Sequence, residues 1–316
     1  MSKPRPWIEA FAPATVSNLG PGFDCLGLAL RGPGDRVRAR RADAPGVKIA
    51  AVEGDGGKLP READKNTAGV AVQAMLRKFA PGAGVELEVH KGLPLGSGLG
   101  SSGASACAAL VAADAALGLG LAPAQLVDLA REGERSACGA AHPDNVAPAI
   151  LGGVVLIPQL EPLRLISLPA PADLWLAIYT PGCSVSTAEA RAVLPAAVPL
   201  AATVQQAGRL GLLVHALHTG DLQLLGEAIV DEIVEPCRAR LIPGYLDAKA
   251  ACCEAGALAC SISGSGPTTF ALAGSQARAE AMLAILEECF TLAGVPGKGL
   301  VDQIGAGARV VSSLLH

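Results

Sequence analysis

The hydrophobic pattern of the first ninety residues predicts mainly strands. Apolar and polar residues alternate in "VELEVH" at 85–90, and a similar alternation, broken by a Pro-Gly turn, runs through 34–52. A period of two is typical of a half-buried strand, and we expect another strand at 8–14. Residues 12–30 carry closely spaced Gly, Pro and Asn, which favours a loop. Apolar residues at helical spacing predict a helix at 66–80, where a Pro-Gly pair follows.

The rest of the chain shows mostly helical spacing. Strands are expected at 152–158, at 174–180 and in the strand–turn–strand segment 257–274. Helices are expected at 102–117, 123–137, 186–194, 201–218, 221–234, 244–255 and 276–290. Because strands dominate early and helices then follow in runs, the pattern favours the α+β class over a doubly wound sheet. We place an N-terminal domain at 1–160 and a C-terminal domain at 161–316.

Composition narrows the class of protein. Hydrophobic residues make up 51% of the chain and charged residues 17%, which supports a large folded core. The net charge of −4 argues against a nucleic-acid-binding protein, and we assign the basic residues at 36–41 to a solvated strand face. The Ala-rich stretch 104–127 contains Asp114 and Pro123, so we expect buried helices and no membrane association.

Cysteine usage and the N-terminus indicate a compartment. The N-terminal residues lack the apolar core of a signal peptide. The chain has nine cysteines without any C-x-x-C or metal-ligand spacing. Buried free thiols behave as small hydrophobic groups, so we expect a reducing cytoplasm. The cysteines are Cys25, Cys107, Cys138, Cys183, Cys237, Cys252, Cys253, Cys260 and Cys289.

The segment "GLPLGSGLGSSGAS" at 92–105 carries the clearest candidate chemistry. A Walker P-loop is excluded because no Lys precedes the serines after Gly100. A dinucleotide fingerprint is formally present, but two helices follow it where that fold needs a second parallel strand. A phosphate cradle fits better, because glycines let backbone N–H groups approach an anion at a helix N-terminus. A flexible Gly/Ser turn stays open as the alternative.

Three ordered segments together resemble the GHMP small-molecule kinases. They are "APATVSNLGPGFDCLGLAL" at 12–30, "PLGSGLGSSGAS" at 94–105 and "SISGSGPTTFAL" at 261–272. The residues of the first segment, and those of "EGERSACGAAHPDNVAPAILGG" at 132–153, are similar to motifs of one branch of this family. That branch phosphorylates the side-chain hydroxyl of L-homoserine on the route to threonine. The resemblance implies an N-terminal half like ribosomal protein S5 and a ferredoxin-like C-terminal half. Phosphorylation of mevalonate or shikimate, or metabolite binding without catalysis, are the alternatives.

The resemblance implies sites for ATP and Mg²⁺. Asn66 is expected to flank adenine. Ser102 and Glu134 are expected to hold Mg²⁺, although Glu134 is also compatible with an exposed ion pair to Arg131 or Arg135. The expected ATP loop consists of Pro94, Leu95, Gly96, Ser97, Gly98, Leu99, Gly100, Ser101, Ser102, Gly103 and Ala104.

Homoserine offers a carboxylate, an ammonium group and a hydroxyl. Arg191 and Arg238 are candidates for the carboxylate, since a guanidinium binds it in a charge-assisted fork; surface ion pairs are the alternative. Thr187 lies near Arg191 in the same segment and is a further substrate candidate. Asn18 and Asp24 are candidates for the ammonium and hydroxyl end, although Asn and Asp near Gly-Pro are often turn formers.

The tetrapeptide "HPDN" at 142–145 is the candidate centre of the reaction. Phosphoryl transfer depends mainly on positioning and charge neutralisation. Guided by the resemblance, we assign Asn145 to orienting the hydroxyl and His142 to substrate contact. Asp144 is a candidate base, and a helix N-cap at Asp144 is compatible with either role. The same analogy predicts a homodimer.

Overall fold

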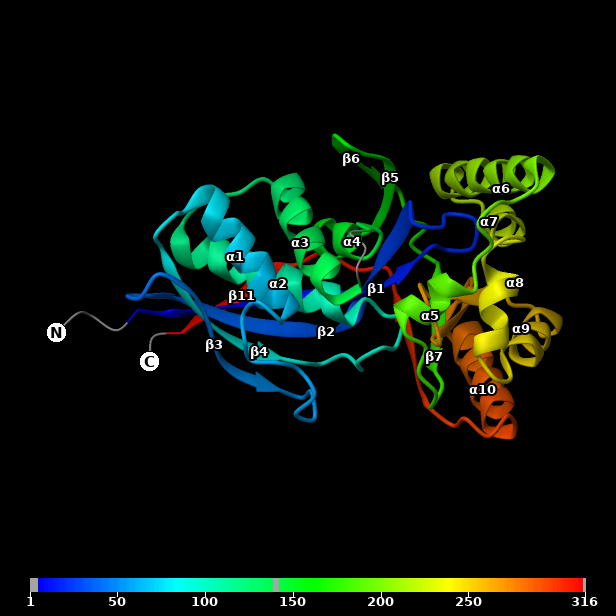
Figure 1. Cartoon of the computed structure of the whole chain (residues 1–316). Helices are drawn as coiled ribbons and strands as arrows, with labels where there is room; N and C mark the ends of the chain where they lie inside the picture. Colours follow the sequence, from blue (N-terminus) through cyan, green and yellow to red (C-terminus); the bar gives the residue numbers. More distant parts are fainter. Residues whose placement is uncertain (1–4, 139–141, 315–316) are drawn as a thin grey trace.

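The computed structural model of the chain describes residues 5–138 and 142–314. It has two lobes, each built on its own sheet (Figure 1). The first sheet contains β1 (Trp7–Ser17), β2 (Leu26–Ala42), β3 (Gly46–Glu53), β4 (Gly84–His90), β5 (Val154–Leu160), β6 (Leu163–Leu168) and β11 (Arg309–Leu314). The first lobe also contains α1 (Thr67–Phe79), α2 (Ser101–Leu117), α3 (Pro123–Cys138) and α4 (Val146–Leu151).

The second lobe is built on a four-stranded sheet. Its strands, in the order β10-β7-β9-β8, are β7 (Trp175–Thr180), β8 (Ala259–Ile262), β9 (Thr269–Ala273) and β10 (Lys298–Gln303). The remaining helices are α5 (Thr187–Ala192), α6 (Leu200–Thr219), α7 (Leu222–Ala228), α8 (Glu235–Arg238), the 3-10 turn η1 (Ala239–Leu241), α9 (Tyr245–Glu254) and α10 (Gln276–Leu292). Strands and helices form separate runs, so the α+β prediction is confirmed.

The seven-stranded sheet is organised by the long strand β2. Its second half pairs antiparallel with β4, and its first three residues pair with β5. β3 and β4 run parallel, joined across α1, as a parallel pair requires. The loop expected at 12–30 is therefore mostly strand, because β1 extends to Ser17 and β2 begins at Leu26. Only 18–25 leaves the sheet.

Helix α2 runs through the core of the first lobe. It packs against β1 and β2 on one side and against α1 and α3 on the other. Twelve of its seventeen residues are buried, most of them Ala, Ser or Gly. Small side chains let the neighbouring strands and helices approach α2 closely, and this close packing on both sides fixes the position of the helix. The helix that follows α2 is α3 and not a parallel strand, so a dinucleotide-binding fold is excluded.

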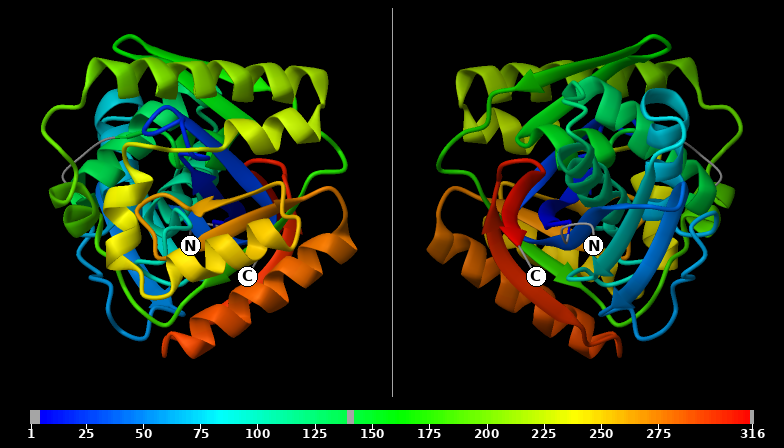
Figure 2. Two further views of the ribbon diagram at one scale, coloured as in Figure 1. Left: turned by 90° about the vertical axis from the view of Figure 1, so that its right-hand side faces the viewer. Right: turned by 90° about the vertical axis from the view of Figure 1, so that its left-hand side faces the viewer.

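Two hydrophobic clusters divide the second sheet by face. On β7, Leu176 and Ile178 join the core that continues into the first lobe, whereas Ala177 and Tyr179 face the other way. This alternation follows the period of a strand. The second face is covered by α9 and α10, which Figure 2 shows crossing beneath the sheet. The two lobes are thus packed through one continuous core.

The C-terminal part of the chain returns to the first lobe. β10 closes the edge of the second sheet, and β11 then pairs with β1, so both ends of the chain lie at the same side (Figure 1). The sequence pattern did not predict β6, β10 or β11. The helix expected at 221–234 ends at Ala228. The boundary between 1–160 and 161–316 stays a prediction; β6 and β11 belong to the first sheet although they follow residue 160.

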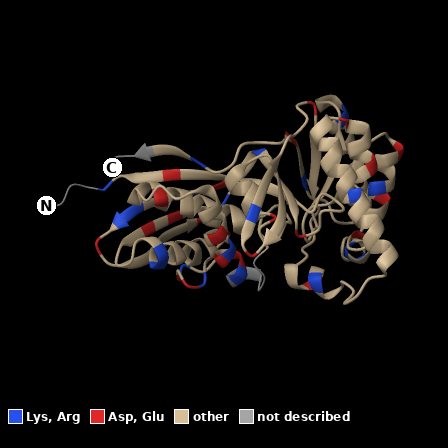
Figure 3. Cartoon of the chain, turned by 90° about the horizontal axis from the view of Figure 1, so that it is seen from above, with Lys and Arg blue, Asp and Glu red and all other residues tan. Residues whose placement is uncertain are grey.

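Charged groups are interspersed over both lobes (Figure 3). The basic residues of β2 pair with acids of neighbouring strands: Arg36 and Arg38 contact Glu9 at 2.8 Å, and Arg40 contacts Glu86 at 2.6 Å. Within 5–138 and 142–314, no helix is long and apolar enough to cross a membrane. The cysteine side chains of the described part are free thiols, and the side chain of Cys138 lies outside it.

Candidate active site

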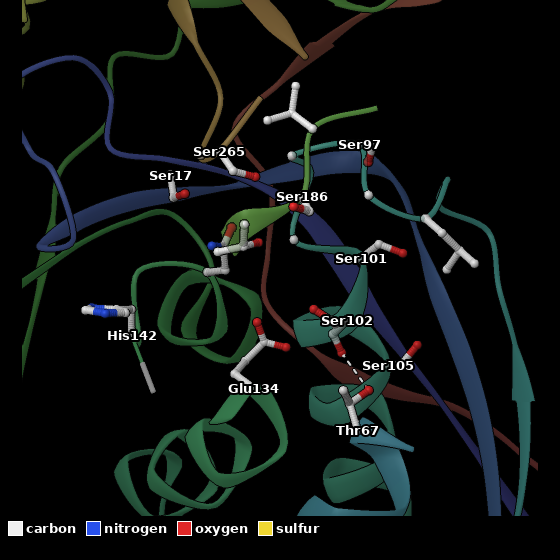
Figure 4. A pocket seen from close by; sticks show the side chains of 18 of the residues that line it. Ser17, Thr67, Ser97, Ser101, Ser102, Ser105, Glu134, His142, Ser186 and Ser265 are labelled. Atoms are coloured by element: carbon white, nitrogen blue, oxygen red, sulfur yellow. Dashed lines mark hydrogen bonds between the residues drawn. The ribbon is translucent and has the colours of Figure 1, made fainter. Parts of the chain in front are cut away.

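A cavity of about 340 Å³ lies between the two lobes. The first lobe lines it with residues of the first motif, the glycine loop and α3, and the second lobe with residues of α5, α8 and the turn after β8. Figure 4 shows side chains converging on it from β1, the glycine loop, α3, the residue before α5 and the turn after β8. The predicted site residues that line it are Asn18, Asp24, Asn66, Leu95, Gly96, Ser97, Gly98, Gly100, Ser101, Ser102, Glu134, His142, Asp144, Asn145, Thr187, Arg191 and Arg238.

The glycine loop ends at the N-terminus of α2, inside this cavity. Gly100 is the N-cap residue with φ 65°, and because it has no side chain it cannot cap the first N–H groups of the helix. A Cβ on Gly100 would lie 2.1 Å from Thr15 Oγ1, so only glycine fits there. The first N–H groups of a buried helix are unsatisfied unless a cap or a ligand binds them, and the helix dipole favours an anion.

The turn after β8 fixes the glycine loop from the second lobe. Ser263 Oγ donates to the Gly98 carbonyl at 2.7 Å, and the Thr268 N–H donates to the Ser97 carbonyl at 3.1 Å. A Cβ on Gly98 would lie 2.6 Å from the Ser263 carbonyl oxygen. The third motif therefore supports the loop by close backbone packing.

A buried ion pair lies beneath the loop. Lys91 Nζ contacts Asp35 Oδ2, and also donates to the Ser101 carbonyl at 2.7 Å and to Ser105 Oγ at 2.9 Å. Asp35 Oδ1 accepts the N–H groups of Gly92 and Leu93 at 2.9 and 3.1 Å. The pair thus joins the start of the loop to the first turns of α2. Burial lowers the pKa of Lys91, and the Asp35 carboxylate opposes this shift.

Glu134 of α3 faces the first turn of α2, next to Ser102 (Figure 4). Its side chain is buried, its carboxyl carbon lies 3.8 Å from the place of a Cβ on Gly103, and its Oε1 has no hydrogen-bond partner among the described residues. Burial raises the pKa of Glu134. The alternative of an exposed helix carboxylate is therefore wrong. An unpaired, buried carboxylate oxygen next to a hydroxyl fits a hard cation such as Mg²⁺.

Asn145 and Asp144 lie at the start of α4. Thr15 Oγ1 donates to Asn145 Oδ1 at 2.8 Å, which orients the amide. Asn145 rather than Asp144 is the N-cap residue, and its side chain makes no capping hydrogen bond. Asp144 is buried, and burial together with the nearby Asp24 carboxylate raises its pKa to about 7. A carboxylate that titrates near neutral pH can accept a proton under physiological conditions.

Asp24 brings three predicted substrate residues together. Arg191 donates to its two oxygens at 2.8 and 3.2 Å, and His142 Nδ1 lies 3.3 Å from Asp24 Oδ2. Burial lowers the pKa of His142, against the opposing effect of Asp24, so the imidazole is neutral at pH 7. Asn18 fixes this arrangement, because its Oδ1 accepts the Asp24 N–H at 3.1 Å.

Arg238 reaches the same place from α8. Its Nε donates to the Ala190 carbonyl at 3.2 Å and its NH1 to the Gly264 carbonyl at 2.6 Å. The Gly264 carbonyl also accepts from Asn18 Nδ2 at 3.1 Å. Arg238 is buried, and its pKa is lowered by burial and by the proximity of Arg191. Neither arginine is merely part of a surface ion pair.

The remaining predicted residues have mixed positions. Asn66 is the N-cap of α1, accepts from the Ala68 N–H at 3.1 Å and lines the cavity. Thr187 opens α5 behind the capping residue Ser186. Four predicted ATP-loop residues do not line the cavity, namely Pro94, Leu99, Gly103 and Ala104. Leu99 and Ala104 are buried in the core instead, where they anchor the loop.

Sequence reasoning missed several residues of this cavity. Lys91, Ser17, Thr67, Ser105 and Ser186 line it but were not predicted. The only signal for Lys91 was a charged residue between strand β4 and the glycine loop, and nothing local pairs it with Asp35. The segment 132–153, used for the resemblance, includes 139–141, which lie outside the described residues.

Comparisons with known proteins identify the family of the chain. Residues 66–153 match the family described as GHMP kinases N terminal domain, and residues 213–292 match GHMP kinases C terminal. A homoserine kinase from Chlorobium phaeobacteroides is 46% identical over 296 residues, which cover 90% of this chain and 92% of the relative. One from Chlorobaculum tepidum is 42% identical over 320 residues, covering 97% and 98%.

A solved structure supports the same conclusion. The crystal structure of homoserine kinase from Cytophaga hutchinsonii matches with a TM-score of 0.93 at 43% identity, covering 96% of this chain and 97% of that chain. The expected fold, with its GHMP N-terminal and C-terminal halves, is confirmed. The chain therefore belongs to the GHMP kinase family and, within it, to the homoserine kinases.

Proposed function

We propose that the protein transfers the γ-phosphoryl group of ATP to the side-chain hydroxyl of L-homoserine, giving ADP and O-phospho-L-homoserine, a step in threonine biosynthesis. The observation that carries this proposal is the composition of the cavity. One side presents an uncapped helix N-terminus and an unpaired carboxylate, and the other presents Asp24 with Arg191 and Arg238. The first set suits a metal-bound triphosphate, and the second suits an amino acid.

The ATP phosphates would lie along 94–104, with backbone N–H groups and the N-terminus of α2 binding their oxygens. The buried pair of Lys91 and Asp35 would hold the loop in this shape before ATP arrives. Adenine would pack beside Asn66, against the apolar side chains of Leu59, Pro60 and Leu95 that line this end of the cavity.

Ser102 and Glu134 would hold Mg²⁺ together with the phosphates. Mg²⁺ keeps waters and phosphate oxygens as most of its ligands, so two protein oxygens are sufficient. No three His, Cys, Asp or Glu side chains gather as a metal centre in the described ranges. When bound, the ion neutralises charge that develops on the transferring phosphoryl group. The carboxylate of Glu134 would be ionised in that state, because a cation offsets the burial that raises its pKa.

The homoserine carboxylate would bind between Arg191 and Arg238. Each guanidinium is fixed by hydrogen bonds within the protein, which lowers the entropy lost on binding. The ammonium group would contact Asp24, which already accepts hydrogen bonds from Arg191. His142, neutral at pH 7, would contact the substrate without adding repulsion to its ammonium group.

The substrate hydroxyl would lie beside Asn145. Thr15 holds the carbonyl oxygen of the Asn145 amide, so its NH₂ group is left to orient the hydroxyl oxygen towards the γ-phosphorus. The hydroxyl oxygen forms the new P–O bond as the bond to the ADP oxygen breaks. Asp144, with a pKa of about 7, would take the hydroxyl proton. We also expect a homodimer in the cytoplasm.

An ADP-release assay tests the proposal. The protein with ATP and Mg²⁺ should release ADP with L-homoserine, and mass spectrometry should identify O-phospho-L-homoserine. L-serine, mevalonate and shikimate serve as controls of shorter chain or different charge. Turnover of mevalonate or shikimate without turnover of homoserine would assign a different substrate, and no turnover over the whole panel would indicate a metabolite-binding protein.

A further inference from the structure

The ring of Phe23 contacts both arginines at the substrate end of the cavity. The guanidinium carbon of Arg238 is 5.1 Å from the centroid of its ring, and that of Arg191 is 5.6 Å away. Both distances fall within the range of cation–π contacts. Phe23 is half-buried and belongs to the short segment between β1 and β2. One aromatic ring therefore contacts two cations that come from α5 and α8.

Two guanidinium groups placed around one ring repel each other. Asp24 neutralises Arg191, but Arg238 has no carboxylate hydrogen-bond partner within the described residues and donates to the carbonyls of Ala190 and Gly264. The face of an aromatic ring carries negative electrostatic potential, which attracts both cations. The ring thus offsets part of the repulsion while leaving N–H groups for an incoming anion.

The segment that carries Phe23 is held in an unusual conformation. Asn18, Leu19 and Asp24 have positive φ angles of 75°, 48° and 57°, which residues other than glycine rarely adopt. Asn18 fixes the segment through hydrogen bonds to the Asp24 N–H and the Gly264 carbonyl. Such residues persist where the surroundings over-determine them, often at binding sites. The ring is therefore in place before a substrate arrives.

We propose that Phe23 is a positioning residue that holds the guanidinium groups of Arg191 and Arg238 at the spacing needed to bind the substrate carboxylate. This inference rests on the proposed homoserine kinase function and adds a residue to its substrate site. It acts through the two arginines and does not contact the transferred phosphoryl group. Its effect should appear in the apparent KM for homoserine and not in that for ATP.

Steady-state kinetics of Phe23→Leu provide the first test. We expect the KM for homoserine to rise about ten-fold, which corresponds to the loss of two modest cation–π contacts. The KM for ATP should stay within two-fold, and Phe23→Tyr should restore most of the affinity. Phe11→Leu is a matched control, because Phe11 also contacts two arginines, Arg36 and Arg309, but neither of these arginines lines the cavity. It should leave both KM values within two-fold.

Replacing the Phe23 ring by fluorinated phenylalanines separates electrostatics from shape. One to three fluorine atoms weaken the negative potential of the ring with little change in its size, so the KM for homoserine should rise progressively with their number. An unchanged KM in the trifluoro variant, or an equal rise in the KM for ATP, overturns the inference. If the wild-type protein itself does not phosphorylate homoserine, the proposed function fails instead, so the two failures are distinguishable.

Discussion

The buried pair of Lys91 and Asp35 allows a quantitative prediction about stability. The side chains are 1% and 0% exposed, and Asp35 accepts four hydrogen bonds, from Lys91, Ser105, Gly92 and Leu93. In Asp35→Asn the amide NH₂ group would face the Lys91 ammonium, whose charge would then be buried without a counter-charge. Removing one partner of a buried pair costs about 3–5 kcal/mol, so we expect the free energy of unfolding to fall by about that amount at pH 7.

The sign of the pH dependence follows from the pKa of Lys91. Burial lowers this pKa, and loss of Asp35 would lower it further. Between the folded and the unfolded pKa the unfolded chain binds more protons, so stability increases with pH in that range. The free energy of unfolding of Asp35→Asn should therefore increase between pH 7 and 10, and by more than that of the wild-type protein.

Urea denaturation of a double-mutant cycle provides the assay. We expect Asp35→Asn/Lys91→Met to lose at least about 2 kcal/mol less than the sum of the two single variants, because the double variant leaves no unpaired charge. Lys48→Met is the control, since Lys48 pairs with Glu86 but is 74% exposed, and such pairs contribute about 1 kcal/mol or less. Additive single effects, or a change below about 1 kcal/mol in Asp35→Asn, would refute the reasoning.

Three further predictions concern the reaction. Gly100→Ala should lower kcat at least about ten-fold, because its Cβ would lie 2.1 Å from Thr15 Oγ1. The control is Gly118→Ala, at the left-handed C-cap of the same helix with free space around it, which should cost only about 1–2 kcal/mol of stability. Equal kcat values for the two variants would contradict the prediction. Glu134→Ala should lower kcat at least about a hundred-fold while ATP binding, measured by fluorescence titration, changes little; normal turnover would remove Glu134 from the metal site. The pKa of Asp144 is raised to about 7 from its ordinary 3.8, so the folded protein holds an extra proton between these pH values and its free energy of unfolding falls as pH rises from 4 to 7. Asp144→Asn should remove up to about 4 kcal/mol of this dependence. Parallel pH profiles of the variant and the wild-type protein in urea denaturation would contradict the assignment.

The pattern of the sequence predicted long, regular elements well and missed those stabilised by distant partners. Helices α2 and α3 were expected within one residue of their observed ends, since their apolar spacing and the flanking Gly and Pro are local signals. Strand β11 was not predicted, because its pairing partner β1 lies at the opposite end of the chain. The segment 12–30 looked like a loop because its glycines dominate the local pattern, whereas hydrogen bonds to β5 and between β1 and β2 make most of it strand.

In the candidate site, too, prediction from the sequence depended on whether the residues that act together are close in sequence. The glycine loop and the start of α2 are adjacent in sequence, so the prediction of their shared role needed only one contiguous segment. By contrast, Asp24 and Arg191 are 167 residues apart, and Asp35 and Lys91 are 56 residues apart. Residue types alone suggested Arg191 and Arg238 as anion-binding residues, but not that both would contact the ring of Phe23.

The sequence by itself predicted the glycine-rich loop before α2 and the class of the fold, because backbone preferences and short-range hydrogen bonds act between neighbouring residues, and its three ordered motifs indicated the family. The tertiary structure alone decided which carboxylate is left unpaired, which aspartate titrates near pH 7 and which lysine is buried beneath the loop. These properties depend on burial and on charges brought together from remote segments, and neither exists until the two lobes have packed.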